Sequence, residues 1–188
     1  MKKTLITILA TVLVCACIVG GTVAWLIDQT DSIENTFTVG NVDIELTETT
    51  GNTYKMIPGS EIEKNPEVTV EEGSESCWLF VKIDETNNTF GTDNSEKYIT
   101  YTPADGWTML KAGIYYRQVL STDTTKSFSV FANDKVSVNE KITKAQADTL
   151  DESSYPKLTL TAYAIQSANT GNVTEAWEKL ETAITTTP

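Results

Sequence analysis

Apolar and polar side chains alternate in short runs along most of this chain, and a period of two leaves few folds open. The run from Thr36 to Glu48 has two alternating halves that differ in phase by one residue, with the change at Gly40. Its apolar positions are Phe37, Val39, Val42, Ile44 and Leu46. Alternation places such side chains on one face of a β-strand. A change of phase at a glycine predicts a β-bulge or bend, and hence one bent strand or two short ones.

Similar runs follow at regular spacing and predict further strands. They are Glu67 to Val70, Cys77 to Ile83, Lys97 to Tyr101, Trp107 to Leu110, Gly113 to Leu120, Lys126 to Phe131, Lys135 to Ile142 and Lys157 to Ile165. Eight or nine short strands separated by turn-forming residues are typical of an all-β fold with two packed sheets. We therefore predict a jelly-roll-like or immunoglobulin-like sandwich over residues 36–184.

Two of these runs carry more specific information. The run from Cys77 to Ile83 is apolar on both faces apart from Lys82, as expected of a central strand that is covered on both sides. Turn sequences flank Trp107 to Leu110, with Asp105-Gly106 before it and Lys111-Ala112-Gly113 after it. This second run and the one that follows it are therefore predicted to form a β-hairpin.

Two segments break the alternation and predict helices. Thr143 and Gln146 have the spacing of a capping box, which opens a short helix ending near Leu150. Asn172 and Glu175 open the second segment, whose apolar residues share one helical face: Val173, Ala176, Trp177, Leu180, Ala183 and Ile184. Glutamates dominate its polar face, so we expect this C-terminal amphipathic helix to pack on the sandwich and not on a membrane. Residues 185–188 are expected to be frayed.

The start of the chain has the three parts of a secretory signal peptide. Lys2 and Lys3 precede an apolar run, and Thr22 and Ala24 provide the small residues before a cut at Trp25. We predict a signal peptide over residues 1–24, which is the only part expected to meet a membrane. A retained anchor is the alternative, because the apolar run continues to Ile27. A lipoprotein is less favoured, because Cys15 and Cys17 lie inside the apolar run.

Charge and cysteine content narrow the partners of the exported chain. The formal net charge is −12, and loss of Lys2 and Lys3 makes it −14. Such a surface repels phosphate backbones, so nucleic acid is not an expected partner. Arg117 is the only arginine. After cleavage Cys77 is the only cysteine, and we interpret it as a small buried hydrophobe, because its run is strongly apolar.

The sequence contains few of the residues that enzymes commonly use for catalysis or metal binding. It contains no histidine, which removes the most common general base and the most common zinc ligand. Acidic pairs occur, as at Glu61 and Glu63, but a chain with 26 acidic residues produces such pairs by chance. No catalytic residue, resident metal or cofactor is predicted. The loop with Asp93, Asn94 and Glu96 is a weak calcium candidate, and a solvated acidic turn is the preferred interpretation.

Three stretches of the sequence carry a resemblance to known proteins. The first is the junction GGTVAWLIDQTDSIENTFTVGNVDIELTE, from Gly20 to Glu48. The second runs from the Ile57-Pro58-Gly59-Ser60 turn through the strand at Val68 to Cys77-Trp78-Leu79-Phe80-Val81. The third is the closing strand and helix, LTLTAYAIQSANTGNVTEAWEKL. These stretches resemble the TasA and camelysin (CalY) family of secreted Gram-positive proteins. Together they cover about half of the chain, and the centre from Asp84 to Tyr155 has no match.

The resemblance implies a jelly-roll sandwich, cleavage by a SipW-type signal peptidase, and a role in the extracellular matrix of biofilms. It also implies polymerisation by donor-strand complementation, in which the new N-terminus of one subunit adds as a strand to the next. Here the donor would be the segment of residues 25–35, continuing to the first strand. Its apolar side chains are Trp25, Leu26, Ile27, Ile33 and Phe37.

Three functions stay open at this stage. The first is a secreted fibre subunit that binds copies of itself, with other matrix proteins as further partners. The second is a metallo-endopeptidase like camelysin, which the absence of histidine disfavours. The third is a monomeric surface adhesin or accessory protein of the fibre.

Overall fold

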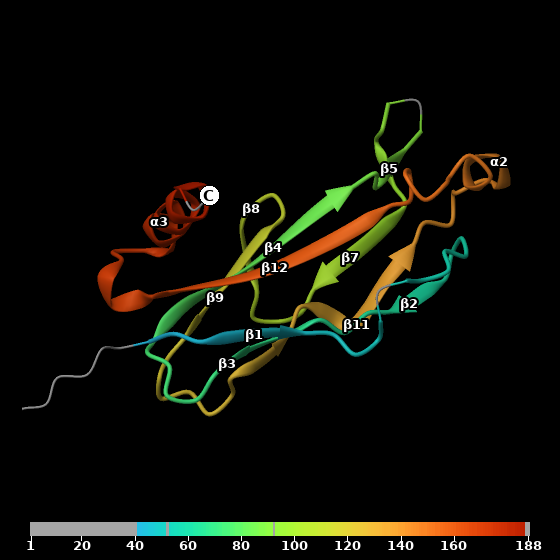
Figure 1. Cartoon of the computed structure of the whole chain (residues 1–188). Coiled ribbons are helices and arrows are strands. Elements are labelled where there is room, and N and C mark those ends of the chain that lie inside the picture. The colour runs from blue at the N-terminus through green and yellow to red at the C-terminus, as the bar shows by residue number, and fades with distance from the viewer. Residues whose placement is uncertain (1–40, 52, 92, 187–188) are drawn as a thin grey trace, which may run out of the picture. The chain divides into compact units, whose positions relative to one another are not determined.

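The computed structural model describes residues 41–51, 53–91 and 93–186, and Figure 1 shows their arrangement. The strands are β1 (Ile44–Thr47), β2 (Glu61–Glu63), β3 (Glu67–Val70), β4 (Cys77–Thr86), β5 (Thr89–Phe90), β6 (Glu96–Lys97), β7 (Ile99–Pro103), β8 (Thr108–Lys111), β9 (Ile114–Val119), β10 (Ser127–Ser129), β11 (Phe131–Val138) and β12 (Lys157–Gln166). The helices are α2 (Lys144–Ala147), the single 3-10 turn η1 (Ser167–Asn169) and α3 (Val173–Thr186). None of these helices is long and apolar enough to cross a membrane.

The first layer of the sandwich consists of two short ladders that continue one another. One has the strand order β1-β3-β10 and the other has the order β2-β11-β7. Hydrogen bonds from the Lys64 amide to the Asp134 carbonyl (2.7 Å) and from the Val130 amide to the Pro66 carbonyl (2.9 Å) bridge the junction. Asn133 and Asp134 both have positive φ angles, 56° and 55°. Both lie where the register of β11 on β7 shifts between Phe131 and Val136, as expected of a β-bulge inside β11.

The second layer is the antiparallel sheet β12-β4-β9-β8. β4 pairs with β12 along its whole length, from Cys77 opposite Gln166 to Thr86 opposite Lys157. On its other side β4 pairs with β9. β8 and β9 form the predicted hairpin, which turns at Gly113, where φ is 74°. A side chain at Gly113 would approach the Ile83 carbonyl oxygen to 2.8 Å, so this turn requires glycine.

The predicted two-sided burial of β4 is confirmed. Leu79, Val81 and Ile83 point into the core between the layers, together with Val68, Phe131 and Val136 of the first layer. Phe80 points the other way, against Trp177 of α3, with ring centroids 5.2 Å apart. The all-β sandwich is thus closed by a helix on the outer face of its second layer.

Both predicted helix starts are confirmed. Thr143 and Gln146 form a complete capping box, and the Glu175 amide donates to the Asn172 side chain at 3.0 Å. The short helix ends at Ala147 and not near Leu150, because the next amides bond three residues back, as from Leu150 to Ala147.

The C-terminal stripe packs on the sheet only in part. Val173, Ala176, Trp177 and Leu180 belong to the outer cluster, whereas Ala183 and Ile184 are exposed, which corrects the expectation that the whole stripe is buried. The helix also extends through Thr185 and Thr186, at the chain end that was expected to be frayed.

Candidate functional site: an open seam between the two layers

One side of the sandwich has two strand edges that face each other across a seam. β12 pairs only with β4, and β2 pairs only with β11, among the described residues. β1 lies beside β12 and pairs with β3, so no strand of the described residues pairs with the free edge of β2. In Figure 1 the orange β12 lies on one side of this seam and the blue-green β1 and β2 lie on the other. Edge strands carry unpaired backbone groups and can accept a further strand.

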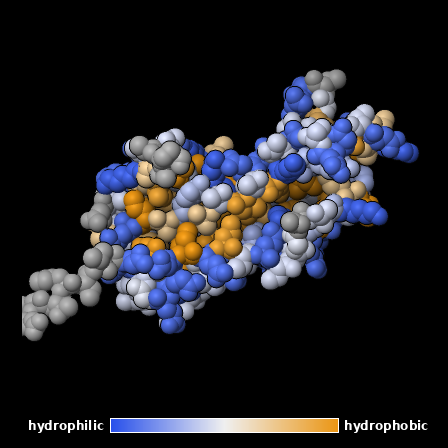
Figure 2. Space-filling model, in the orientation of Figure 1, coloured by the Kyte–Doolittle hydropathy of each residue, from blue (hydrophilic) through white to orange (hydrophobic). Residues whose placement is uncertain are grey.

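A groove of about 750 Å³ opens at the seam where β2 and the first residues of β12 border it. Its apolar lining comes from the loop before β2, from both layers and from the segment around α2: Met56, Pro58, Ile62, Ile99, Val136, Ile142, Ala147, Leu150, Pro156 and Leu158. Figure 2 shows an apolar band that crosses this face of the molecule. Within the described residues, core side chains such as Ile99 and Val136 therefore line an open groove on this side.

Core residues along the seam are only half-buried. Leu158, Leu160, Ala162 and Ala164 of β12 pack against the buried cluster but keep part of their surface exposed. Ile44 and Leu46 of β1 and Ile62 of β2 do the same on the opposite side. A contiguous row of half-buried apolar side chains between two strand edges is a surface suited to binding.

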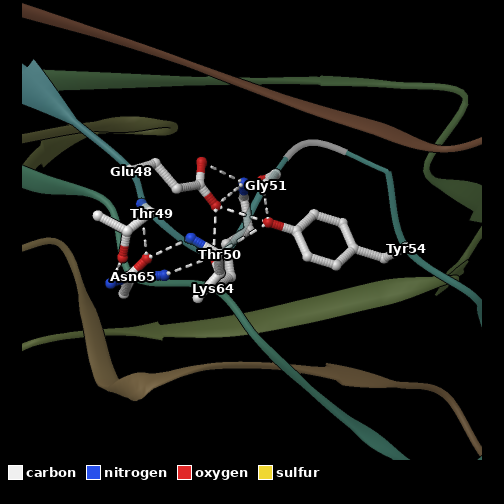
Figure 3. A network of polar contacts seen from close by, with 7 residues as sticks. All are labelled: Glu48, Thr49, Thr50, Gly51, Tyr54, Lys64 and Asn65. Atoms are coloured by element: carbon white, nitrogen blue, oxygen red, sulfur yellow. Dashed lines mark hydrogen bonds and ion pairs between the residues drawn. The ribbon is translucent and has the colours of Figure 1, made fainter.

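A polar network, drawn in Figure 3, fixes the loop that forms one wall of the groove. The Lys64 ammonium donates to both oxygens of Glu48 at 2.8 Å, and its side chain is only 10% exposed. The Tyr54 hydroxyl donates to Glu48 at 2.7 Å and also contacts the Gly51 carbonyl. Asn65 accepts from the amides of Thr49 and Thr50, each at 3.1 Å. The segment from Glu48 to Tyr54 is thereby tied to the junction of β2 and β3.

The electrostatics of this network keep Glu48 ionised. Burial alone raises the pKa of its carboxyl, but hydrogen bonds from Lys64, Tyr54 and Thr50 outweigh burial, and the pKa falls below its ordinary value of 4.5. Burial and the nearby Glu48 charge raise the pKa of Tyr54, so its hydroxyl remains a donor at neutral pH. The Lys64 ammonium lies 5.3 Å from the centre of the Tyr54 ring, which adds a cation–π contact.

The sequence did not single out this groove. Glu61-Ile62-Glu63 was not predicted as a strand, although its three residues alternate. The sequence also gave no reason to pair Glu48 with Lys64, 16 positions further on.

The predicted cleavage residues Thr22, Ala24 and Trp25 lie outside the described residues. So do the donor residues Leu26, Ile27, Ile33 and Phe37. These sites stay predictions, and so does the division of the chain at residues 24 and 35.

The calcium candidate lies in the turn between β5 and β6. Asp93 accepts a hydrogen bond from the Ser95 amide at 3.2 Å, and Glu96 accepts from Lys141 and Asn139. Bonds with Ser95 lower the pKa of Asp93, and bonds with Lys141 and Asn139 lower that of Glu96. Asn94 has a positive φ of 54°. Calcium binding here stays a prediction.

A family described as camelysin metallo-endopeptidase matches residues 1–98, slightly more than half of the chain. The chain belongs to the camelysin family. The match includes β1 to β4 and the polar network, and so one wall of the groove. Searches of curated proteins and of solved structures found no match.

Among the described residues, no side-chain group suits the metal in the camelysin family's description. The whole sequence lacks histidine. Cys77 is fully buried in β4, as predicted, and burial raises the pKa of its thiol to about 11, so it is not a ready thiolate ligand. Over the part of the chain that the structure describes, no three Asp, Glu, Cys or His side chains form a group that could hold a metal ion. Carboxylates alone suit zinc poorly, so no catalytic step is assigned to a metal.

Proposed function

We propose that this protein is a secreted structural subunit of an extracellular matrix or surface fibre. In this proposal the segment of residues 25–35 of one copy adds as a β-strand to the seam of the next copy. The observation that supports it is the apolar groove between the edges of β2 and β12. Both borders of that groove offer the backbone groups that an added strand needs.

The donor sequence matches the chemistry of the groove. In an extended strand, side chains two residues apart share a face, which places Trp25, Ile27, Ile33 and Phe37 together, with Gln29, Asp31 and Asn35 between them. The groove side would bury this face against Met56, Ile62 and Leu158 and their neighbours. Full burial of a large apolar side chain stabilises by about 1.5–3 kcal/mol, so a few such side chains suffice for a stable contact.

Addition from one copy to the next produces a fibre, because a head-to-tail contact of this kind does not close on itself. Cleavage between Ala24 and Trp25, by a SipW-type signal peptidase, frees the donor end. Assembly therefore follows export, and other matrix proteins can join the polymer through the same edge pairing.

Electron microscopy of the purified chain that begins at Trp25 tests the proposal. Filaments are expected from that chain, and none from a chain that lacks residues 25–35. On the groove side, Leu158→Arg should abolish filaments. Met109→Arg is the matched control, because Met109 is 62% exposed on β8, at the opposite edge of the same layer. Monomers from every version, or equal filaments from both arginine variants, reject the proposal.

A second candidate is the peptidase named by the family description. Chelator-sensitive cleavage of casein by the pure protein would support it. Inactivity with added zinc would count against it, as we expect from a chain without histidine.

A further inference from the structure

The groove at the seam is an exception to the charge of the surface around it. The chain has 26 acidic residues against 14 basic ones, yet no Asp or Glu lines the groove. Three lysines line it instead: Lys55 and Lys64 on the side of the loop before β2, and Lys157 at the start of β12. In so acidic a protein, a cationic rim around an apolar groove singles out this site.

The lysines at this rim also differ from the others in their partners. Eight lysines of the described residues form ion pairs with Asp or Glu. Lys126 donates to the carbonyls of Leu120 and Ser121. Within the described ranges this leaves Lys55 and Lys157, whose side chains are exposed and whose ammonium groups make no ion pair or hydrogen bond with another described residue. The two uncompensated ammonium groups thus both lie at the groove.

We propose that Lys55 and Lys157 recognise the carboxylates of an acidic strand and thereby select it as the occupant of the groove. The occupant is residues 25–37 of a second copy of this chain, so the inference rests on the proposed function. Asp28, Asp31 and Glu34 give that segment three negative charges and no positive side chain. Charge complementarity of this kind guides encounter, fixes register and rejects wrong partners.

The positions of two of the three acidic residues fit an added strand. With Trp25, Ile27, Ile33 and Phe37 directed into the groove, Asp28 and Glu34 fall on the opposite, outward face, whereas Asp31 falls on the groove-facing side. Lys55 and Lys157 are exposed on the walls of the groove. Their long, flexible side chains can reach carboxylates on the outward face of the added strand. Asp28 and Glu34, which contribute to the unusual polarity of this donor strand, thus have a role as its recognition signal.

Lys64 makes a different contribution. Its ammonium is held by both oxygens of Glu48 and is nearly buried, so it is not available to a second carboxylate without breaking that pair. Lys64 holds the wall of the groove in place, and the exposed Lys55 and Lys157 bind the carboxylates of the added strand.

The test measures the lowest concentration of secreted, cleaved protein at which fibres form. The double variant Lys55→Gln/Lys157→Gln should raise this concentration about threefold to tenfold, because each exposed ion pair contributes modestly. The matched control is Lys111→Gln/Lys179→Gln, which removes two positive charges from β8 and α3 and should change it less than twofold. Thermal unfolding of both variants checks that the fold is intact.

Charge-reversal variants test most directly whether the two lysines pair with the acidic residues of the donor strand. Lys55→Glu/Lys157→Glu should block assembly, Asp28→Lys/Glu34→Lys should block it too, and the combination of all four changes should restore it. Restoration supports the inference. Equal effects of the two Gln variants, or no restoration in the combined variant, overturn the inference. If the unaltered protein still forms fibres in that case, the proposed function stands. Absence of fibres from the unaltered protein overturns both.

Discussion

Replacement of Lys64 by Met tests whether the polar network holds the wall of the groove. Met keeps most of the apolar stem of Lys64 but removes the ammonium that donates twice to Glu48. The Glu48 carboxylate is then left with Tyr54 and Thr50 as hydrogen-bond donors, at 2.7 and 3.1 Å. It is 23% exposed, so water compensates the lost charge only in part. We expect a less stable protein with a displaced loop.

The magnitude follows from the degree of burial. Removal of one partner from a fully buried ion pair costs about 3–5 kcal/mol, and an exposed pair contributes about 0–1 kcal/mol. The pair of Lys64 and Glu48 lies between these cases, with side chains 10% and 23% exposed. We therefore expect about 2 kcal/mol of destabilisation, or a fall in Tm of about 4–8 °C for a domain of this size.

A double-mutant cycle separates the pair from its surroundings. Lys64→Met, Glu48→Gln and the combined variant are compared by urea unfolding, followed by tryptophan fluorescence. Because Glu48→Gln removes the charge that Lys64→Met leaves uncompensated, the combined variant should lose at least about 1 kcal/mol less than the sum of the single losses. Additive losses, or a loss below about 0.5 kcal/mol for Lys64→Met, would refute the reasoning.

Three further predictions concern stability and reactivity. Trp177→Ala removes the main contact of α3 with Phe80 and should cost about 3–5 kcal/mol in urea unfolding; a smaller cost than 1 kcal/mol would mean that the helix does not cover the sheet. Cys77 is fully buried with a pKa of about 11, so in the chain that starts at Trp25 a thiol reagent at pH 8 should label it only after unfolding. Labelling at the rate of a free thiol would contradict that burial. The pKa of Glu48 is lower in the folded protein, so its contribution to stability is complete above about pH 4.5 and disappears as the pH falls through the lowered value. Glu48→Gln should therefore flatten the pH dependence of Tm in that acid range, and identical profiles for the two proteins would contradict the assignment.

Local sequence patterns were sufficient to predict those features that depend on residues within a single strand or helix. The strand from Glu67 to Val70 has the predicted bounds, because its alternation is strict. The apolar run of β4 correctly predicted burial on both faces, and the spacing of Thr143 and Gln146 correctly predicted a capping box. In each case the signal and the structure lie within a few residues of each other.

The groove could not be predicted in this way, because it depends on which strands lack a partner. Val68 pairs with Phe128 across 60 positions, and no local pattern specifies that choice. Burial of Lys64 depends on Glu48 arriving from another segment, and an isolated lysine is normally expected at the surface. Ile184 fits the apolar stripe of α3, yet it is 42% exposed, because the stripe is longer than the cluster on the sheet that it covers.

The proposed function depends on what occupies the seam in an assembled fibre. Electron cryo-microscopy of fibres grown from the chain that begins at Trp25 shows directly which segment lies in the seam. We predict one extra strand between β12 and β2 of each subunit, traceable to residues 25–35 of its neighbour, with the Trp25 ring in the groove. A groove that is empty in the fibre, or filled by the same subunit's own segment, would contradict the account.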